Sequence, residues 1–217
     1  MAQSARETDR LIPTSPSIPA YPSFGAAIAD PGPLGLAAFA GTTFFLSVVN
    51  SGMLSGTVEA AVLGLAFFYG GLAQLLAGMW EFVKGNTFGA LAFSSYGAFW
   101  LSFWYLVDHV LPGLAKANPA DVGHAVGLYL LVWTIFTAYM TIAASRVSGA
   151  VLAVFVFLTL TFLALTIGAF ADASSWNKLG GWLGLVTAVL AWYASFAGVT
   201  NATFKRSVLP VFVLSRG

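Results

Sequence analysis

The chain has 217 residues, of which 59% are hydrophobic and only 8% charged, and its formal net charge is +1. Soluble domains carry about 25% charged residues, so this composition excludes an ordinary soluble protein, and the small net charge gives no attraction to nucleic acid. Because the chain has no cysteine, it has no disulfide framework, thiolate metal site or cysteine nucleophile. We therefore predict an all-α integral membrane protein without a cofactor or a metal site, and not an enzyme.

The N-terminal segment, residues 1–29, is polar and rich in proline. Four prolines lie among Ser and Thr residues, and the segment lacks the apolar core of a signal peptide. We predict a disordered cytoplasmic tail, so that the first membrane helix itself directs insertion. A six-helix transmembrane domain is predicted over 30–204, followed by a short cytoplasmic tail over 205–217.

A short motif closes the tail and opens the apolar part of the chain. Its residues are Asp30, Pro31, Gly32, Pro33, Leu34, Gly35 and Leu36. The aspartate is a good N-cap, and the two prolines fall in the first helical turn, where their missing N–H groups are not needed. The free N–H groups of the last three residues then lie near the positive end of a helix dipole. The motif is either a plain helix start or a docking point for a small anion.

Six segments are long and apolar enough to be membrane spans, which need about 20 residues. They are 33–53, 58–80, 87–108, 124–145, 148–171 and 180–202. An even number of spans places both termini on one side. Seven of the nine Lys and Arg residues fall on that side, and only Lys116 and Lys178 fall on the other. The positive-inside rule therefore predicts a multi-pass protein of the cell membrane with both termini in the cytoplasm.

Few residues in the spans are suited to chemistry. His109 and His124 are the only histidines and lie without a nearby ligand cluster, which favours loop roles over metal binding. In the second span, Gln74 and Glu81 share one helix face. Gln74 needs a partner, either in another helix or along a water-filled route. Glu81 precedes Lys84 by three residues, and we predict a boundary ion pair between them rather than a proton-carrying site.

Hydroxyl groups recur in several spans, and together they are suited to a narrow path for a small hydrogen-bonding solute. They are Thr42 and Thr43 in the first span, Ser94, Ser95 and Tyr96 in the third, and Thr159 and Thr161 in the fifth. A hydroxyl also bonds readily to its own helix, so no single one of them identifies a path.

The motif at 30–36 resembles the Asn-Pro-Ala/Gly-Pro-Leu-Gly-Leu signature of the acetate uptake transporter family, the succinate–acetate permeases. Further motifs that resemble the family lie at 67–74, 81–89, 92–100, 129–137 and 206–210. The resemblance implies a six-helix bundle that assembles as a homohexamer in the lipid bilayer, with a pathway within each protomer. It also implies passage of acetate, and in some members succinate, either linked to protons or channel-like.

The resemblance further implies an apolar constriction formed by Phe39, Tyr96 and Leu158. Our hypothesis is that a small monocarboxylate docks near 30–36 and crosses this constriction as the neutral acid. Moving the carboxylate form from water into an apolar constriction would cost a large free energy. Tyr96 is expected to offer its hydroxyl at the narrowest point. Hydrogen bonds beside the constriction are assigned to Thr43, Gln74, Ser94 and Ser95.

One departure and two alternatives remain open. Asp30 stands where the family usually has Asn, and its charge either weakens anion docking or favours the protonated acid. The first alternative function is a hexameric channel for a small neutral solute such as urea, ammonia or water. The second is a structural or signalling membrane protein without transport.

Overall fold

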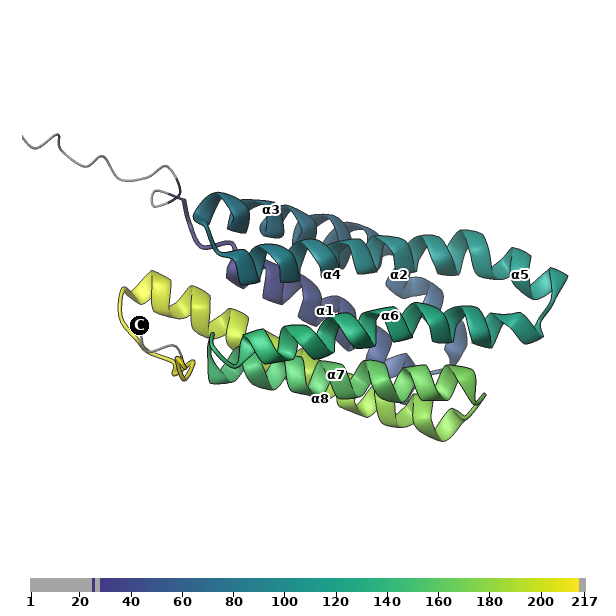
Figure 1. Ribbon diagram of the computed structural model, residues 1–217. Helices are drawn as coiled ribbons and strands as arrows, with labels where there is room; N and C mark the ends of the chain where they lie inside the picture. The colour runs from purple at the N-terminus through teal and green to yellow at the C-terminus, as the bar shows by residue number, and fades with distance from the viewer. Residues whose placement is uncertain (1–24, 26–27, 215–217) are drawn as a thin grey trace, which may run out of the picture.

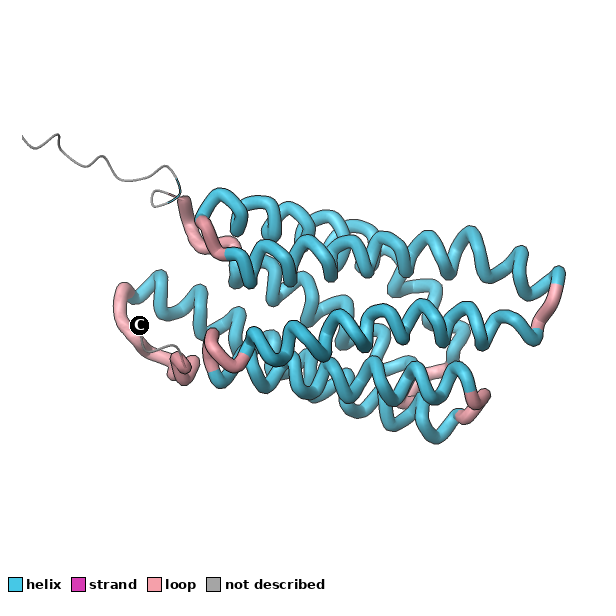
Figure 2. Tube along the Cα trace, viewed as in Figure 1, coloured by secondary structure: helices cyan, strands magenta, loops and turns pink. Residues whose placement is uncertain are grey.

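The computed structural model describes residue 25 and residues 28–214, so most of the predicted tail over 1–29 lies outside the described residues. The described chain is built from helices (Figures 1 and 2). Six of them are long and apolar enough to cross a membrane. They are Gly32–Asn50, Gly56–Lys84, Thr87–Ala117, Ala120–Ala144, Gly149–Phe170 and Ser174–Phe204. The predicted all-α, six-span architecture is confirmed.

Two of the six spans are interrupted, and the other four are single α-helices. The single helices are α1 (Gly32–Asn50), α6 (Ala120–Ala144), α7 (Gly149–Phe170) and α8 (Ser174–Phe204). The second span consists of a 3-10 turn (Gly56–Ala61), α2 (Val62–Phe67), a π-helical turn (Phe68–Ala73) and α3 (Gln74–Lys84). The third consists of α4 (Thr87–Tyr105), a π-helical turn (Leu106–Val110) and α5 (Leu111–Ala117).

Two predicted helix ends were wrong. The third span was expected to end at residue 108, before Pro112, but helical structure continues to Ala117. Proline lacks the N–H that an α-helix would use, and here it falls in the first turn of α5, directly after a π-helical turn that already interrupts the regular bonding. Helix α8 begins at Ser174, earlier than expected, because Asp172 adopts a left-handed conformation with φ of 47° and completes a tight turn.

Both ends of the described chain lie at the same end of the bundle, together with the α3–α4 and α6–α7 turns (Figure 1). We call this the terminal end and the opposite one the far end. The most extensive packing is between α1 and α8, α8 and α7, α7 and α6, and α3 and α4. Glycines allow some of these approaches, since Gly181 of α8 faces the backbone of Ser51 directly.

Aromatic side chains fill the centre of the bundle, where α4 and α6 make few backbone contacts. The buried cluster joins α1, α4, α6 and α7. Its large members are Phe39, Tyr96, Phe99, Trp100, Met140, Phe155, Leu158 and Phe162. The core of the molecule is therefore an aromatic layer between helices.

The described part of the predicted C-terminal tail, residues 205–214, folds back onto the start of α7. The N–H of Gly149 donates to the carbonyl of Phe212 at 2.7 Å, and the N–H of Leu214 donates to Val147 at 3.3 Å. The Asn201 side chain holds the bend by accepting from the N–H groups of Val208 and Leu209. This segment therefore packs beside the α6–α7 turn at the terminal end.

Candidate functional site

Two cavities lie along the bundle, one toward each end. The far cavity has a volume of about 690 Å³, and its wall includes Asn50, Glu59 and Asp172. The terminal cavity is smaller, about 160 Å³, and its wall includes Glu81 and Asn86. Phe39 and Leu158 line both cavities. A single layer of side chains therefore separates the two spaces.

The layer contains the three residues assigned to the constriction, each from a different helix. Phe39 of α1, Tyr96 of α4 and Leu158 of α7 belong to one buried cluster and are 4%, 3% and 3% exposed. The ring centroids of Phe39 and Tyr96 are 5.6 Å apart, and Phe155 packs against Tyr96 from the side at 6.0 Å. The layer is apolar except for the tyrosine hydroxyl.

The hydroxyl of Tyr96 does not point its proton into the path. Its oxygen lies 2.8 Å from Oγ1 of Thr137, and Thr137 donates its own proton to the carbonyl of Trp133 at 2.7 Å. Because Thr137 has one proton, Tyr96 must be the donor between the two hydroxyls. The expectation that Tyr96 offers its O–H to a solute is therefore wrong in this structure, where the residue contributes its ring.

Gln74 lines the terminal cavity from α3. Its side chain is fully buried, and neither the amide nitrogen nor the amide oxygen has a hydrogen-bond partner among the described residues. A buried amide without partners is unfavourable, which makes this group unusual in a helix bundle. The amide has a donor and an acceptor available for a molecule in the cavity.

The other predicted hydroxyl groups divide between the path and the helix contacts. Thr43 lines the far cavity, and its Oγ1 has no partner within the described chain. Ser94 instead packs against Gly78, where α3 and α4 meet, and Ser95 lines neither cavity. Ser94 and Ser95 were therefore wrongly assigned to the path, since neither lines a cavity and Ser94 lies in the contact between α3 and α4.

The start of α1 differs from the expected bare helix mouth. The helix begins at Gly32 with Pro31 at the N-cap, and the Asp30 carboxylate accepts the N–H of Gly32 at 3.2 Å. The N–H of Gly35, expected to be free, donates to the carbonyl of Pro31 at 3.1 Å. A hydrogen bond from α8 also holds this turn, since the carbonyl of Pro33 accepts the Ser195 hydroxyl at 2.6 Å.

Side chains also cover this helix start. The ring of Phe93 lies directly against Gly35, and a Cβ atom placed there would be 2.6 Å from it. Leu34 points outward with 46% exposure, and Leu36 lines the terminal cavity. Of the motif, Asp30, Gly32 and Leu36 reach the cavity wall. The amide of Gly35 is therefore not free to bind an anion.

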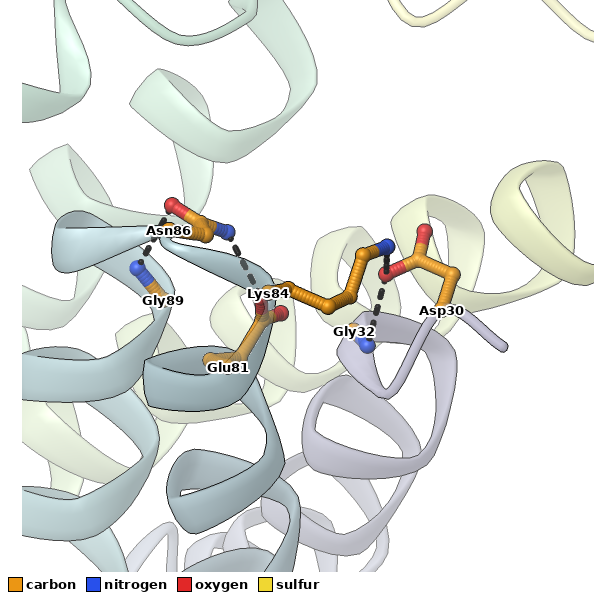
Figure 3. A network of polar contacts seen from close by, with 6 residues as sticks. All are labelled: Asp30, Gly32, Glu81, Lys84, Asn86 and Gly89. Carbon is orange, nitrogen blue, oxygen red and sulfur yellow. Dashed lines mark hydrogen bonds and ion pairs between the residues drawn. The ribbon is translucent and has the colours of Figure 1, made fainter. Parts of the chain in front are cut away.

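A polar network borders the terminal cavity (Figure 3). Lys84 pairs with Asp30 at 3.2 Å, and Glu81 accepts from the amide nitrogen of Asn86 at 2.9 Å. The predicted ion pair between Glu81 and Lys84 was therefore wrong, because a carboxylate distant in sequence takes the lysine. Sequence reasoning missed Asn86 altogether; its position directly before α4, where it accepts the N–H of Gly89 as an N-cap, is the available signal.

Comparison with known proteins finds several relatives that align with most of this chain. Acetate permease A of Emericella nidulans is 43% identical, covering 84% of this chain and 65% of that protein. Ammonia transport outward protein 2 of Saccharomyces cerevisiae is 41% identical, with the same two coverages. The chain thus spans less than two thirds of the length of these two fungal relatives. The succinate-acetate/proton symporter SatP of Escherichia coli K12 is 38% identical, covering 85% of this chain and 95% of that protein.

The structure also has a solved counterpart. The bacterial acetate channel SatP superposes with a TM-score of 0.76 at 36% identity, covering 85% of this chain and 99% of the other. The sequence matches the model of the GPR1/FUN34/yaaH family over residues 14–216. This match extends over most of the chain. The chain therefore belongs to the GPR1/FUN34/yaaH family.

Proposed function

We propose that the protein carries acetate, and as a second substrate succinate, across the cell membrane through the two cavities and the layer of Phe39, Tyr96 and Leu158. The observation that carries the proposal is the lining of both cavities by Phe39 and Leu158, so that one thin apolar layer is all that divides them. Support also comes from relatives named for acetate and succinate transport.

The solute crosses the layer as the neutral acid. A carboxylate moved into an apolar environment loses hydration that costs tens of kcal/mol in the limiting case, whereas a neutral group costs a few. The one hydroxyl in the layer is committed to Thr137 and gives an anion no proton to bond. Gln74 offers a donor and an acceptor, which complement the C=O and O–H of a carboxylic acid. Uptake therefore rises as the external pH falls and is linked to protons.

The terminal end of the bundle faces the cytoplasm in this proposal. Of the described Lys and Arg residues, four lie at that end (Lys84, Arg146, Lys205 and Arg206) and two lie at the far end (Lys116 and Lys178), which agrees with the positive-inside rule. Solute then enters through the far cavity and leaves through the terminal cavity. The chain assembles as a homohexamer with a pathway in each protomer, and chemical cross-linking in native membranes tests that number.

The experiment is uptake of labelled acetate and succinate into proteoliposomes, with protein-free vesicles measured in parallel to subtract passage of neutral acid through the lipid. Uptake should exceed the protein-free rate and rise as the pH is lowered. Phe39→Ala should change both the rate and the exclusion of larger carboxylates, because it opens the layer. The matched control is Phe68→Ala, since that ring is 67% exposed on the outside of the bundle. If protein-dependent uptake does not change with pH and is the same in Phe39→Ala as in the wild type, the mechanism is refuted.

The rival function is passage of a small neutral solute, and it is favoured by one relative named for ammonia transport. The two functions differ in competition. Propionate should block labelled acetate, and urea in excess should leave acetate uptake unchanged. Block by urea, or ammonia flux without any acetate flux, would favour the neutral-solute channel. Absence of any solute movement would leave the structural or signalling role.

A further inference from the structure

Glu81 is a buried carboxyl group that the path does not otherwise explain. It lies on α3, on the same helix face as Gln74 and about 10 Å further along, by the rise of about 1.5 Å per residue. Its side chain is 1% exposed, yet it forms part of the wall of the terminal cavity. An ionisable residue within a membrane span is rare and is a functional-site hypothesis by default.

Among the described residues, Glu81 accepts one side-chain hydrogen bond, from a neutral amide, and forms no ion pair. Oε2 accepts from Nδ2 of Asn86 at 2.9 Å, and the orientation of that amide is fixed because its Oδ1 accepts the N–H of Gly89. The lysine one turn away pairs with Asp30 instead. A buried carboxylate needs partners for both of its oxygens, and the described residues supply one hydrogen bond, from Asn86.

The second carboxyl oxygen is the free one. A Cβ atom on Gly89 would lie 2.9 Å from Oε1, and one on Gly32 would lie 3.6 Å from it and 3.3 Å from Oδ1 of Asp30. Both neighbours are glycines, so neither of them places a side chain in the gap between Oε1 and the carboxylate of Asp30. Asp30 is half exposed, which places solvent just beyond this gap.

The charged and titratable groups that face Glu81 within the described chain are few. Asp30 faces it from the segment before α1, and Lys84 from its own helix. Helix α4 presents the neutral Asn86 and Gly89. From the side of α7, apolar residues complete the cavity wall, namely Val147, Val151, Val154 and Phe155. Apart from Asp30 and Lys84, the described residues that face Glu81 carry no titratable group.

We propose that Glu81 is the proton-exchange site of the pathway. When a carboxylic acid has crossed the layer, its O–H bond breaks, an O–H bond forms at Oε1 of Glu81, and the acid leaves as a carboxylate. Glu81 then gives the proton to water in the gap at Gly32, beside Asp30, and is ionised again. In the reverse direction Glu81 supplies the proton to an entering carboxylate. This role rests on the proposed carboxylate transport.

The role predicts a particular pH profile. A simple carboxyl group with a pKa near 4 is almost fully ionised at about pH 7.5 and partly neutral at about pH 5. A path that relies on neutral acid from bulk solution therefore slows about tenfold for each unit of rising pH. Exchange through a path with its own proton site slows less as the pH rises, because Glu81 supplies a proton to a carboxylate within the terminal cavity.

The test is exchange of labelled acetate in proteoliposomes that hold equal acetate and equal pH on both sides, with the protein-free rate subtracted. Relative to the wild type, Glu81→Gln should be within about twofold at pH near 5 and at least about tenfold slower at pH near 7.5. Glu81→Asp keeps a titratable group and should restore the wild-type profile. Asp121→Asn, which removes an exposed carboxyl at the far end, is the matched control and should leave the profile unchanged.

A merely structural role for Glu81 gives a different result. Glu81→Gln would then slow exchange by one factor at both pH values, and that outcome overturns the proposal, as does an unchanged rate at pH near 7.5. If the glutamine variant does not fold, Glu81→Ala answers the same question. Failure of the wild type to exceed protein-free vesicles is a separate outcome, which refutes the proposed transport itself.

Discussion

Gln74→Met should make the protein more stable and a poorer transporter at the same time. Methionine is close to glutamine in length and volume but has no amide, so the substitution removes the polar group with little change in packing. Gln74 is fully buried, and its amide nitrogen and oxygen lack partners within the described chain. Few substitutions in a packed core are expected to change stability and activity in opposite directions.

The size of the stability change follows from the missing partners. A buried polar group without a hydrogen bond costs about 1–3 kcal/mol relative to a satisfied one. Removing it should raise the free energy of unfolding by up to that amount. For a chain of this length, about 1 kcal/mol shifts Tm by roughly 2–4 °C. Tryptophan fluorescence during heating in detergent should therefore show a rise in Tm of about 2–12 °C.

Transport should fall because the neutral acid loses its bonding partner just beyond the layer. A neutral hydrogen bond contributes about 0.5–1.5 kcal/mol net, which corresponds to a decrease of about twofold to thirteenfold in acetate exchange. The control is Thr187→Val, since Thr187 is equally buried but donates to the Leu183 carbonyl at 2.9 Å and lines neither cavity. That variant should lose stability and keep its exchange rate. A Gln74→Met protein that melts lower, or that exchanges acetate at the wild-type rate, would refute the reasoning.

Two further predictions concern the layer and the polar network. Tyr96→Phe should keep acetate exchange within about twofold, because the hydroxyl proton is already bound within the bundle, and should lose about 0.5–1.5 kcal/mol of stability in a melting curve. A large loss of exchange with unchanged stability would show that the hydroxyl contacts the solute. Gly89→Ala should lower stability by about 1–3 kcal/mol, since its Cβ would lie 2.6 Å from the Asn86 amide. Gly64→Ala, with open space at its Cβ position, is the control that should be tolerated.

The fold was largely predictable from composition and hydropathy. The six spans follow from apolar length, which the bilayer dictates whatever the tertiary packing. The ends of two spans were not predictable, because a π-helical turn before Pro112 and a left-handed Asp172 restore continuity in ways that residue type alone does not reveal. Local backbone geometry decided both.

The site was only partly predictable. The three residues of the layer followed from a family resemblance, since nothing in their spacing relates α1, α4 and α7. The direction of the Tyr96 proton depends on Thr137, which lies 41 residues away. Likewise the covering of Gly35 by Phe93 depends on how α4 packs on α1. Partners set by tertiary packing have no signal in local sequence, and the four errors at the site are of this kind.

The aspartate that departs from the family motif has a consequence for Glu81. Asp30 lies 54 residues before Lys84 and takes its ammonium group at 3.2 Å. Without that carboxylate, the acidic group remaining within one helical turn of Lys84 is Glu81. In Asp30→Asn, Lys84 should therefore turn toward Glu81 and form an ion pair with it. Glu81 then no longer exchanges a proton with the solute.

Acetate exchange at pH near 7.5 should then fall by about twofold to fivefold in Asp30→Asn, because a partly exposed ion pair is worth up to about 1 kcal/mol. The double variant Asp30→Asn with Lys84→Ala has no lysine to redirect and should recover the wild-type rate. If the double variant is as slow as the single one, Asp30 acts on the solute directly and not through Lys84. Since both variants keep the Gly32 N–H bonded to a side-chain oxygen at position 30, the comparison separates the charge at this position from its role at the helix start.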